Sequence, residues 1–260
     1  MKLMRASWTL IRNAFLLGVL PLSAFSQMPA TPVHNIVLVH GAWADGSSWA
    51  KVIPILEKKG FHVTAVQNPL TSFADDVAAT KRIIDAQDGP VLLVGHSYGG
   101  AIITEAGDDP KVAGLVYVAA FAPEEGQSAV EQGKPYPTPG GGEIRPDASG
   151  FLSLTAKGIT EDFAPDLPSV DQQIMIATQG PTSVNALGAK VTHSAWKTKH
   201  CWYIVASNDR MISPTQERSS ALNMKADSTE IPASHVVMLS HPAEVEAVIE
   251  KAAIGAADQK

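Results

Sequence analysis

Residues 90–100 read PVLLVGHSYGG, an apolar run that ends in a serine with glycines two positions before and after it. The run 90–97 predicts a buried strand, and residues 98–107 predict a helix that begins at once. So sharp a turn needs these glycines, because a Cβ there would collide with neighbouring backbone. The turn would lift the Ser97 hydroxyl above the strand end, beside free N–H groups of the helix. A glycine-rich turn in which Ser97 merely caps the helix is the alternative.

Further strand and helix patterns alternate on both sides of this unit. Strands are predicted at 35–43, 61–66, 112–121, 201–207 and 228–231, and helices at 48–59, 72–86, 214–224 and 242–254. Alternation of this kind predicts an α/β fold, in which helices cover both faces of a mostly parallel sheet. We therefore expect one such domain over residues 27–260.

The stretch from about 122 to 195 interrupts the alternation. It begins with the turn-rich segment PEEGQSAVEQGKPYPTPGGGEIRPDASG, holds no convincing strand, and continues with short helical pieces around 151–163 and 169–178. Long insertions between sheet strands are commonly functional, so this one predicts a cap over the site. A surface insertion without a role is the alternative.

Residues 1–26 have the pattern of a secretory signal peptide. Basic residues precede a twelve-residue apolar run, 14–25, which is short for a membrane span, and Ala24 and Ser26 suit cleavage after Ser26. An uncleaved membrane anchor is the alternative. Cleavage predicts an exported protein, periplasmic or secreted, with no stable membrane insertion. It would remove three basic residues and no acidic one, leaving 17 basic and 26 acidic residues and a net charge of −9.

An acidic balance argues against nucleic acid as a partner. The single cysteine, Cys201, cannot form an internal disulfide and opens a strand-like run, so we interpret it as a small buried hydrophobe. The sequence has no metal-ligand spacing, P-loop or dinucleotide-binding glycine pattern. We therefore expect no cofactor and no metal, whereas the oligomeric state is not predicted.

A serine hydroxyl is a poor nucleophile without a base, and the base is expected on a loop after a late strand. His235 lies in such a loop. The competing His241 precedes Pro242 and is expected at a helix start. We interpret His40 and His96 as structural residues whose side chains point away from Ser97.

A carboxylate that orients the base is expected between the serine and the histidine in sequence. Asp209 follows the strand 201–207 and suits that role, although "SNDR" is also a good turn. Glu217 and Glu230 are set aside because they lie inside a helix and a strand. The backbone N–H groups of Ala42 and Tyr98 are the candidate donors to a developing oxyanion.

On these motifs the chain resembles the α/β-hydrolases, and especially plant methyl esterases, hydroxynitrile lyases and their bacterial relatives. The resemblance spans about residues 35–250 and rests on VLVHGAWADGSSW, LVGHSYGGAIITEAG, YIVASNDRMISP and SHVVMLSHP. It implies the same roles for Ser97, Asp209 and His235, and the same N–H donors. The lyases of this group carry threonine and lysine where this chain has Gly41 and Val236, so the resemblance favours the esterases.

The combined expectation is an exported serine hydrolase that cleaves small to medium carboxylic esters through an acyl-enzyme. A cofactor-free lyase or perhydrolase using the same three residues is one alternative. A ligand-binding protein that keeps the fold without catalysis is the other.

Overall fold

A six-stranded parallel sheet forms the centre of the molecule. The structure is a computed structural model that describes residues 32–257. The strand order is β2-β1-β3-β4-β8-β9, and all neighbouring pairs run parallel. The strands are β1 (Asn35–Val39), β2 (His62–Ala65), β3 (Val91–His96), β4 (Val112–Val118), β8 (Cys201–Ala206) and β9 (Asp227–Ile231). Because all six point the same way, their carboxyl ends meet at one edge, where ligands bind in open α/β sheets.

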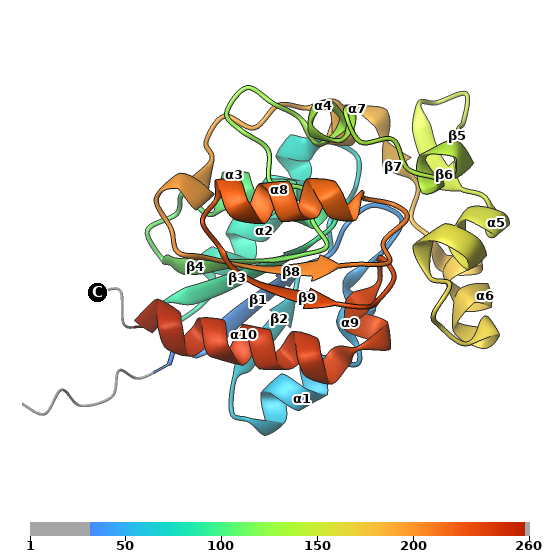
Figure 1. Cartoon of the computed structure of the whole chain (residues 1–260). Coiled ribbons are helices and arrows are strands. Elements are labelled where there is room, and N and C mark those ends of the chain that lie inside the picture. The colour runs from blue at the N-terminus through green and yellow to red at the C-terminus, as the bar shows by residue number, and fades with distance from the viewer. Residues whose placement is uncertain (1–31, 258–260) are drawn as a thin grey trace, which may run out of the picture.

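Helices cover both faces of the sheet. They are η1 (Gly46–Trp49), α1 (Ile53–Lys58), α2 (Phe73–Asp85), α3 (Tyr98–Ala106), η4 (Ala195–Lys197), α8 (Pro214–Asn223), α9 (Val237–Ser240) and α10 (Pro242–Ala257). Figure 1 shows α2, α3 and α8 on one face and α1, α9 and α10 on the other. Side chains alternate along β3 between two buried clusters, with Leu93 in one and Leu92 and Val94 in the other. Each face of the sheet therefore has its own apolar core.

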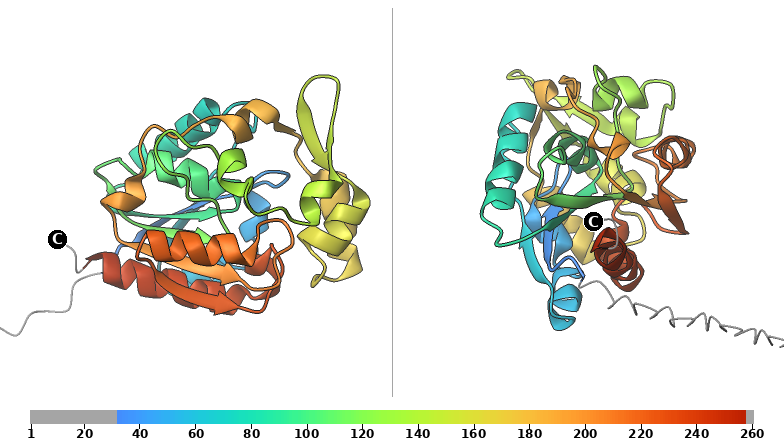
Figure 2. Two further views of the ribbon diagram at one scale, coloured as in Figure 1. Left: turned by 45° about the horizontal axis from the view of Figure 1, so that its top comes forward. Right: turned by 90° about the vertical axis from the view of Figure 1, so that its left-hand side faces the viewer.

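The insertion between β4 and β8 forms a cap at one end of the sheet. Its elements are α4 (Ala129–Gly133), η2 (Gly140–Glu143), β5 (Ile144–Pro146), β6 (Phe151–Leu154), α5 (Ala156–Gly158), η3 (Ile159–Phe163), α6 (Ser169–Thr178), β7 (Thr182–Ser183) and α7 (Val184–Gly188). The strands make a small antiparallel sheet in the order β5-β6-β7. The left view of Figure 2 shows the yellow cap elements gathered at one end of the central sheet.

The predicted fold class is confirmed, and each predicted strand of the central sheet is present. Two local predictions are wrong. The expected helix 48–59 is divided into η1, capped by Asp45, and α1, which has Pro54 in its first turn. The cap was expected to hold no strand, but it contains three, and the expected helical piece 151–163 begins as β6. These strands are two to four residues long, too short for a clear alternation of side chains.

Residues 1–31 lie outside the part of the chain that the structure describes, so the predicted signal peptide 1–26 is not seen. Within residues 32–257, no helix is both long enough and apolar enough to cross a membrane.

Candidate active site

Ser97 occupies the sharp turn between β3 and α3. Its backbone has φ 54° and ψ −124°, a region that L-residues rarely adopt. Its carbonyl accepts hydrogen bonds from the N–H groups of Gly100 (2.9 Å) and Phe121 (3.1 Å), which hold this conformation. Trp43 and Ala119, just beyond the ends of β1 and β4, also have positive φ. Such conformations cost about 1–3 kcal/mol each and gather at functional sites, so the strain marks this edge of the sheet.

Glycines allow three chain segments to meet at this turn. A Cβ on Gly41 would lie 2.7 Å from Ser97 Cβ and 3.2 Å from Ser97 Oγ. A Cβ on Gly99 would lie 2.4 Å from the Val39 carbonyl oxygen. The distances of 2.7 and 2.4 Å are shorter than real Cβ contacts, so only glycine permits this packing. The loop after β1 is therefore pressed directly against Ser97.

Asp209 and His235 form a buried pair on the neighbouring loops. Asp209 follows β8 and His235 follows β9, and the distance from His235 Nδ1 to Asp209 Oδ2 is 2.6 Å. Asp209 Oδ1 also accepts hydrogen bonds from the N–H groups of Met211 (2.6 Å) and Ile212 (3.0 Å). Because Nδ1 donates to Asp209, the remaining nitrogen, Nε2, is the basic one. Among residues 32–257, Nε2 has no hydrogen-bond partner.

Ser97 and His235 line the same cavity at the carboxyl edge of the sheet. The cavity has a volume of about 340 Å³. Ala42 and Tyr98 also line it, and the cap contributes apolar side chains that include Val130, Ile144 and Leu187. Cavities of this size that are mostly apolar with a few polar groups commonly hold small molecules. The structure thus brings Ser97, His235, Ala42 and Tyr98 to one cavity, and the fifth predicted residue, Asp209, contacts His235 beside it.

The candidate oxyanion donors flank Ser97 on both sides. Tyr98 is the first residue of α3, and Ala42 follows the glycine that packs against Ser97. The Tyr98 side chain is fixed by its hydroxyl, which donates to Asp76 Oδ2 at 2.8 Å. Burial raises the pKa of Asp76 to about 6. The Tyr98 side chain therefore anchors the start of α3 to α2.

His96 supports the loop that carries His235. Its Nε2 donates to the His235 carbonyl oxygen at 2.9 Å, and the two rings lie 4.7 Å apart. Burial holds the pKa of His96 well below its ordinary value, so the ring stays neutral. These contacts give His96 a structural role, as predicted. His40 is structural as predicted, because its Nε2 accepts from the N–H of Asn68 at 3.0 Å.

Sequence reasoning missed Glu217, which lies on α8 behind Asp209. It is fully buried, and its Oε2 accepts a hydrogen bond from the N–H of Ala206 at 2.9 Å. Burial first, and then the charge and hydrogen bonding of Asp209, raise the pKa of Glu217 well above its ordinary value. The raised pKa keeps the Glu217 carboxyl protonated beside Asp209. Glu217 is a neutral acid that shares its burial.

Two acidic side chains of the cap hold the loops that carry Asp209 and His235. Asp162 pairs with the Arg210 guanidinium, with 2.6 Å between Oδ1 and Nε. Asp166 accepts hydrogen bonds from the Ser234 N–H, at 2.8 Å, and from the Ser234 hydroxyl. Between them, the ring of Phe163 lies 5.2 Å from that of His235. One short segment of the cap therefore contacts both loops.

Cys201 and His241 are placed as the sequence predicted. Cys201 lies buried at the start of β8, and burial raises the pKa of its thiol to about 12, so it is a poor nucleophile. His241 ends α9 directly before Pro242 of α10, and its Nδ1 bonds with the Ser240 hydroxyl. Within residues 32–257, no group of three or more His, Cys, Asp or Glu side chains could hold a metal ion.

The neutral Glu217 gives a testable dependence of stability on pH. A carboxyl whose pKa is raised by folding stabilises the folded state fully below its unfolded pKa, 4.5, and loses this effect as pH rises through the folded pKa. Glu217→Gln retains the acceptor for Ala206 and cannot ionise. The free energy of unfolding of Glu217→Gln minus that of wild type should increase by about 1.4 kcal/mol for each pH unit between the unfolded and folded pKa values of Glu217.

Urea unfolding of both proteins at pH 5 and pH 8 measures this difference. Glu57→Gln, an exchange on the exposed face of α1, controls for the loss of one acidic residue. A difference between wild type and Glu217→Gln that is equal at both pH values would contradict a neutral Glu217.

Comparison with known proteins places these features in a family. A carbendazim hydrolyzing esterase of Nocardioides sp. is 39% identical over 108 residues, which are 36% of this chain and 45% of that enzyme. The chain thus aligns with less than half of that relative. Methylesterase 8 of Arabidopsis thaliana is 27% identical over 207 residues, 71% of this chain and 75% of its own length. The resemblance to plant methyl esterases is therefore confirmed.

A solved structure shares the fold over most of the chain. The crystal structure of polyneuridine aldehyde esterase superposes with a TM-score of 0.71 at 21% identity, covering 82% of this chain and 96% of that one. The family model described as "Alpha/beta hydrolase family" matches residues 36–248, which include the turn at Ser97 and the loops of Asp209 and His235. The chain belongs to the alpha/beta hydrolase family.

Proposed function

We propose that the protein is a serine hydrolase that cleaves carboxylic esters of small to medium size through an acyl-enzyme intermediate. The observation that carries the proposal is the strained Ser97 in one cavity with His235, whose Nδ1 lies 2.6 Å from Asp209. A nucleophile, a base and a carboxylate that orients the base are the groups that ester hydrolysis requires. The esterase names of the relatives support the same reaction class.

In the proposed acylation, Ser97 Oγ attacks the ester carbonyl carbon while His235 Nε2 takes the hydroxyl proton. The N–H groups of Ala42 and Tyr98 donate to the carbonyl oxygen as it becomes an oxyanion. The C–O bond to the alcohol then breaks, and the imidazolium returns its proton to the departing alkoxide. Asp209 holds the ring in orientation and stabilises its positive charge throughout.

In the proposed deacylation, a water molecule replaces the alcohol. His235 Nε2 accepts a proton from the water as its oxygen attacks the acyl carbon. The bond between the acyl carbon and Ser97 Oγ breaks, the proton passes to Oγ, and a carboxylic acid leaves. No group outside the protein and water takes part, so no cofactor is proposed.

The cavity supports an uncharged, mostly apolar substrate. Its wall includes Phe121, Tyr136 and Leu187, and its volume of about 340 Å³ limits the ester to modest size. Lys134 also lines the cavity but is itself exposed to solvent. We therefore propose neutral esters in preference to charged ones.

A panel of short esters, lactones and amides incubated with the purified protein tests the activity. We expect hydrolysis of p-nitrophenyl acetate and butyrate, and a mass adduct of an organophosphonate on Ser97. The same preparation should release no cyanide from mandelonitrile above background. Intact esters together with efficient cyanide release would contradict the proposal, and failure of both reactions would favour a binding protein.

The residues at two positions, Gly41 and Val236, argue against lyase activity. A Cβ at Gly41 would clash with Ser97, so the threonine of the related lyases does not fit this backbone. Val236, where those lyases carry lysine, is buried in the core cluster around α10 and supplies no charge for a departing cyanide. Both features favour hydrolysis.

We also propose that residues 1–26 are a signal peptide and that the enzyme acts outside the cytoplasm. The arrangement of basic and apolar residues in that segment supports this. Mass spectrometry of exported material should find an N-terminus at Gln27. A chain that is retained in the membrane with its first residues intact would contradict it.

A further inference from the structure

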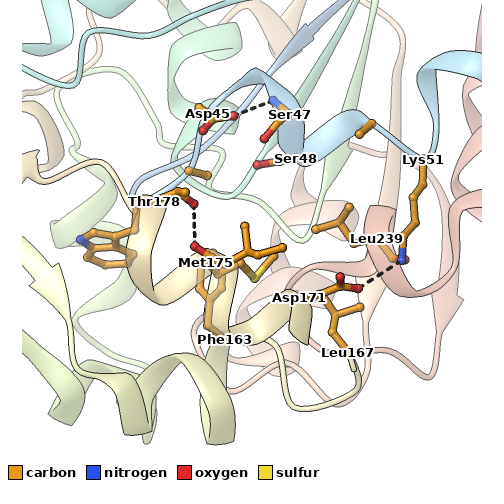
Figure 3. Close-up of a pocket in the computed structure, with 14 residues that line it drawn as sticks. Asp45, Ser47, Ser48, Lys51, Phe163, Leu167, Asp171, Met175, Thr178 and Leu239 are labelled. Carbon is orange, nitrogen blue, oxygen red and sulfur yellow. Dashed lines mark hydrogen bonds and ion pairs between the residues drawn. The ribbon is translucent and has the colours of Figure 1, made fainter. Parts of the chain in front are cut away.

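A second cavity of about 230 Å³ lies next to the catalytic cavity. It lies between η1 and the cap helix α6 and is partly open to solvent, and Figure 3 shows Phe163 and Met175 facing it from the cap, across from Ser47 and Ser48. The amino group of Lys51 and the carboxylate of Asp171 form an ion pair of 3.8 Å at its side. Its lining is mostly apolar, and the polar side chains on it are those of Asp45, Ser47, Ser48, Lys51, Asp171 and Thr178. A hydrocarbon chain or an aryl ring suits such a space.

Trp43 belongs to the walls of both cavities. It is the residue directly after Ala42, and it lines the catalytic cavity together with Ser97 and His235. It also lines the second cavity together with Phe163, whose ring lies 5.2 Å from the ring of His235. The two cavities are therefore neighbours across one layer of side chains.

Several contacts hold the indole of Trp43 in this wall. Its Nε1 donates to the Leu152 carbonyl oxygen at 2.9 Å, and its backbone N–H donates to Thr182 Oγ1 at 3.2 Å. Both partners lie on the small sheet of the cap. The φ of 57° is unusual for a bulky aromatic residue and persists because these contacts fix it. The position of the indole is thus determined by the cap as well as by the loop after β1.

We propose that Trp43 determines specificity by closing the catalytic cavity against the second cavity. The indole limits the length of the substrate arm that fits beside Ser97. The second cavity is then the space that the end of a longer apolar arm occupies once the indole is removed. Joining the cavities would enlarge the first by about two thirds, because their volumes are about 340 and 230 Å³. This inference rests on the hydrolase activity proposed above.

The test compares chain-length profiles of wild type and Trp43→Ala. Rates are measured for p-nitrophenyl esters from acetate to decanoate, and for acetate esters of alcohols of increasing length. We expect Trp43→Ala to raise the octanoate-to-acetate ratio of kcat/KM, or the matching ratio in the alcohol series, by about 10-fold or more. If the acyl series changes, the acyl chain contacts the indole of Trp43, and if the alcohol series changes, the alcohol chain does. Trp43→Phe, which retains a ring and loses the bond to Leu152, should keep a profile near that of wild type.

Refilling the second cavity provides a matched control. Ile174 lines that cavity from α6 and is 55% exposed, so a larger side chain is tolerated there. Ile174→Trp alone should leave the wild-type profile unchanged, whereas in the Trp43→Ala background it should cancel the gain for octanoate. A general loss of folding would lower all esters together and could not be reversed by Ile174→Trp.

The possible results distinguish a failure of the role proposed for Trp43 from a failure of the proposed hydrolase activity. Hydrolysis of short esters with a profile that Trp43→Ala and Trp43→Leu leave unchanged would overturn the inference and leave the function intact. If wild type cleaves no ester, the proposed function fails. The role of Trp43 is then tested by measuring the affinity of octan-2-one for wild type and the variants by calorimetry. Tighter binding of octan-2-one to Trp43→Ala, reversed by Ile174→Trp, supports the wall, and equal binding to all variants overturns it.

Discussion

Ser97→Ala should lower ester turnover on the order of 10⁴-fold to 10⁶-fold, because the remaining groups cannot form an acyl-enzyme. Its melting temperature should stay close to that of wild type. The Ser97 turn is held by backbone hydrogen bonds from Gly100 and Phe121, which alanine retains, and alanine has no greater difficulty than serine at φ 54°. Initial rates with p-nitrophenyl butyrate and a thermal melt of the same sample measure both effects.

The control for Ser97→Ala is the loss of a serine elsewhere. Ser72 caps α2 by accepting a hydrogen bond from the Asp75 N–H at 3.1 Å. Ser72→Ala should lower stability by about 1 kcal/mol and leave turnover close to wild type. Ser97→Ala should therefore lower the rate and leave stability unchanged, whereas Ser72→Ala should lower stability and leave the rate unchanged. Turnover near the wild-type rate in Ser97→Ala would refute the assigned nucleophile.

Asp209→Asn should lower turnover by about 10⁴-fold, as expected when the base takes the wrong tautomer. The backbone N–H groups of Met211 and Ile212 point at Oδ1 and would select the amide oxygen of asparagine for that place. The amide NH₂ would then face His235 Nδ1 and donate to it. The ring proton would move to Nε2, where it blocks proton transfer from Ser97.

The buried Glu217 should not rescue this variant. Its Oε2 is bonded to the Ala206 N–H, and its raised pKa keeps it neutral. A matched control is Asp227→Asn, which alters a second aspartate–histidine pair, with 3.2 Å between Asp227 Oδ2 and His200 Nε2 at the surface. We expect wild-type turnover there. The role given to Asp209 is refuted if both variants retain full activity between pH 6 and pH 9.

The sequence could predict that the candidate residues lie close together, because each lies just after a strand of a parallel sheet. A strand pattern therefore places Ser97, Asp209 and His235 at one edge before any contact is known. Glu217 was missed because it was judged by its place inside a helix. A closer signal existed, since Glu217 and Ala221 are four residues apart and both face the sheet. An acidic side chain on the buried side of a helix needs a hydrogen-bond partner. Asp209 is close to Glu217 only in the folded structure, so the sequence pattern of α8 does not reveal it.

The cap was the least predictable part. Its strands β5, β6 and β7 have few residues, and Phe151 pairs with Ser183, which is far away in the chain. Local patterns do not contain such pairings, which depend on the fold around them. The hydrogen-bond partner of His96 could not be predicted for a similar reason, because it is the backbone of a loop 139 residues away.

The contacts of Asp162 and Asp166 have a consequence for cap exchange between relatives. Arg210 follows Asp209 and Ser234 precedes His235, so a cap that lacks Asp162 or Asp166 removes support from the loop that carries Asp209 or from the loop that carries His235. A chimera that imports foreign residues for 159–167 alone should therefore lose catalytic rate as well as change selectivity. We therefore expect that segments 159–167, 209–212 and 234–236 must be exchanged together, whereas the exposed hairpin tip around Ser149 can be exchanged alone.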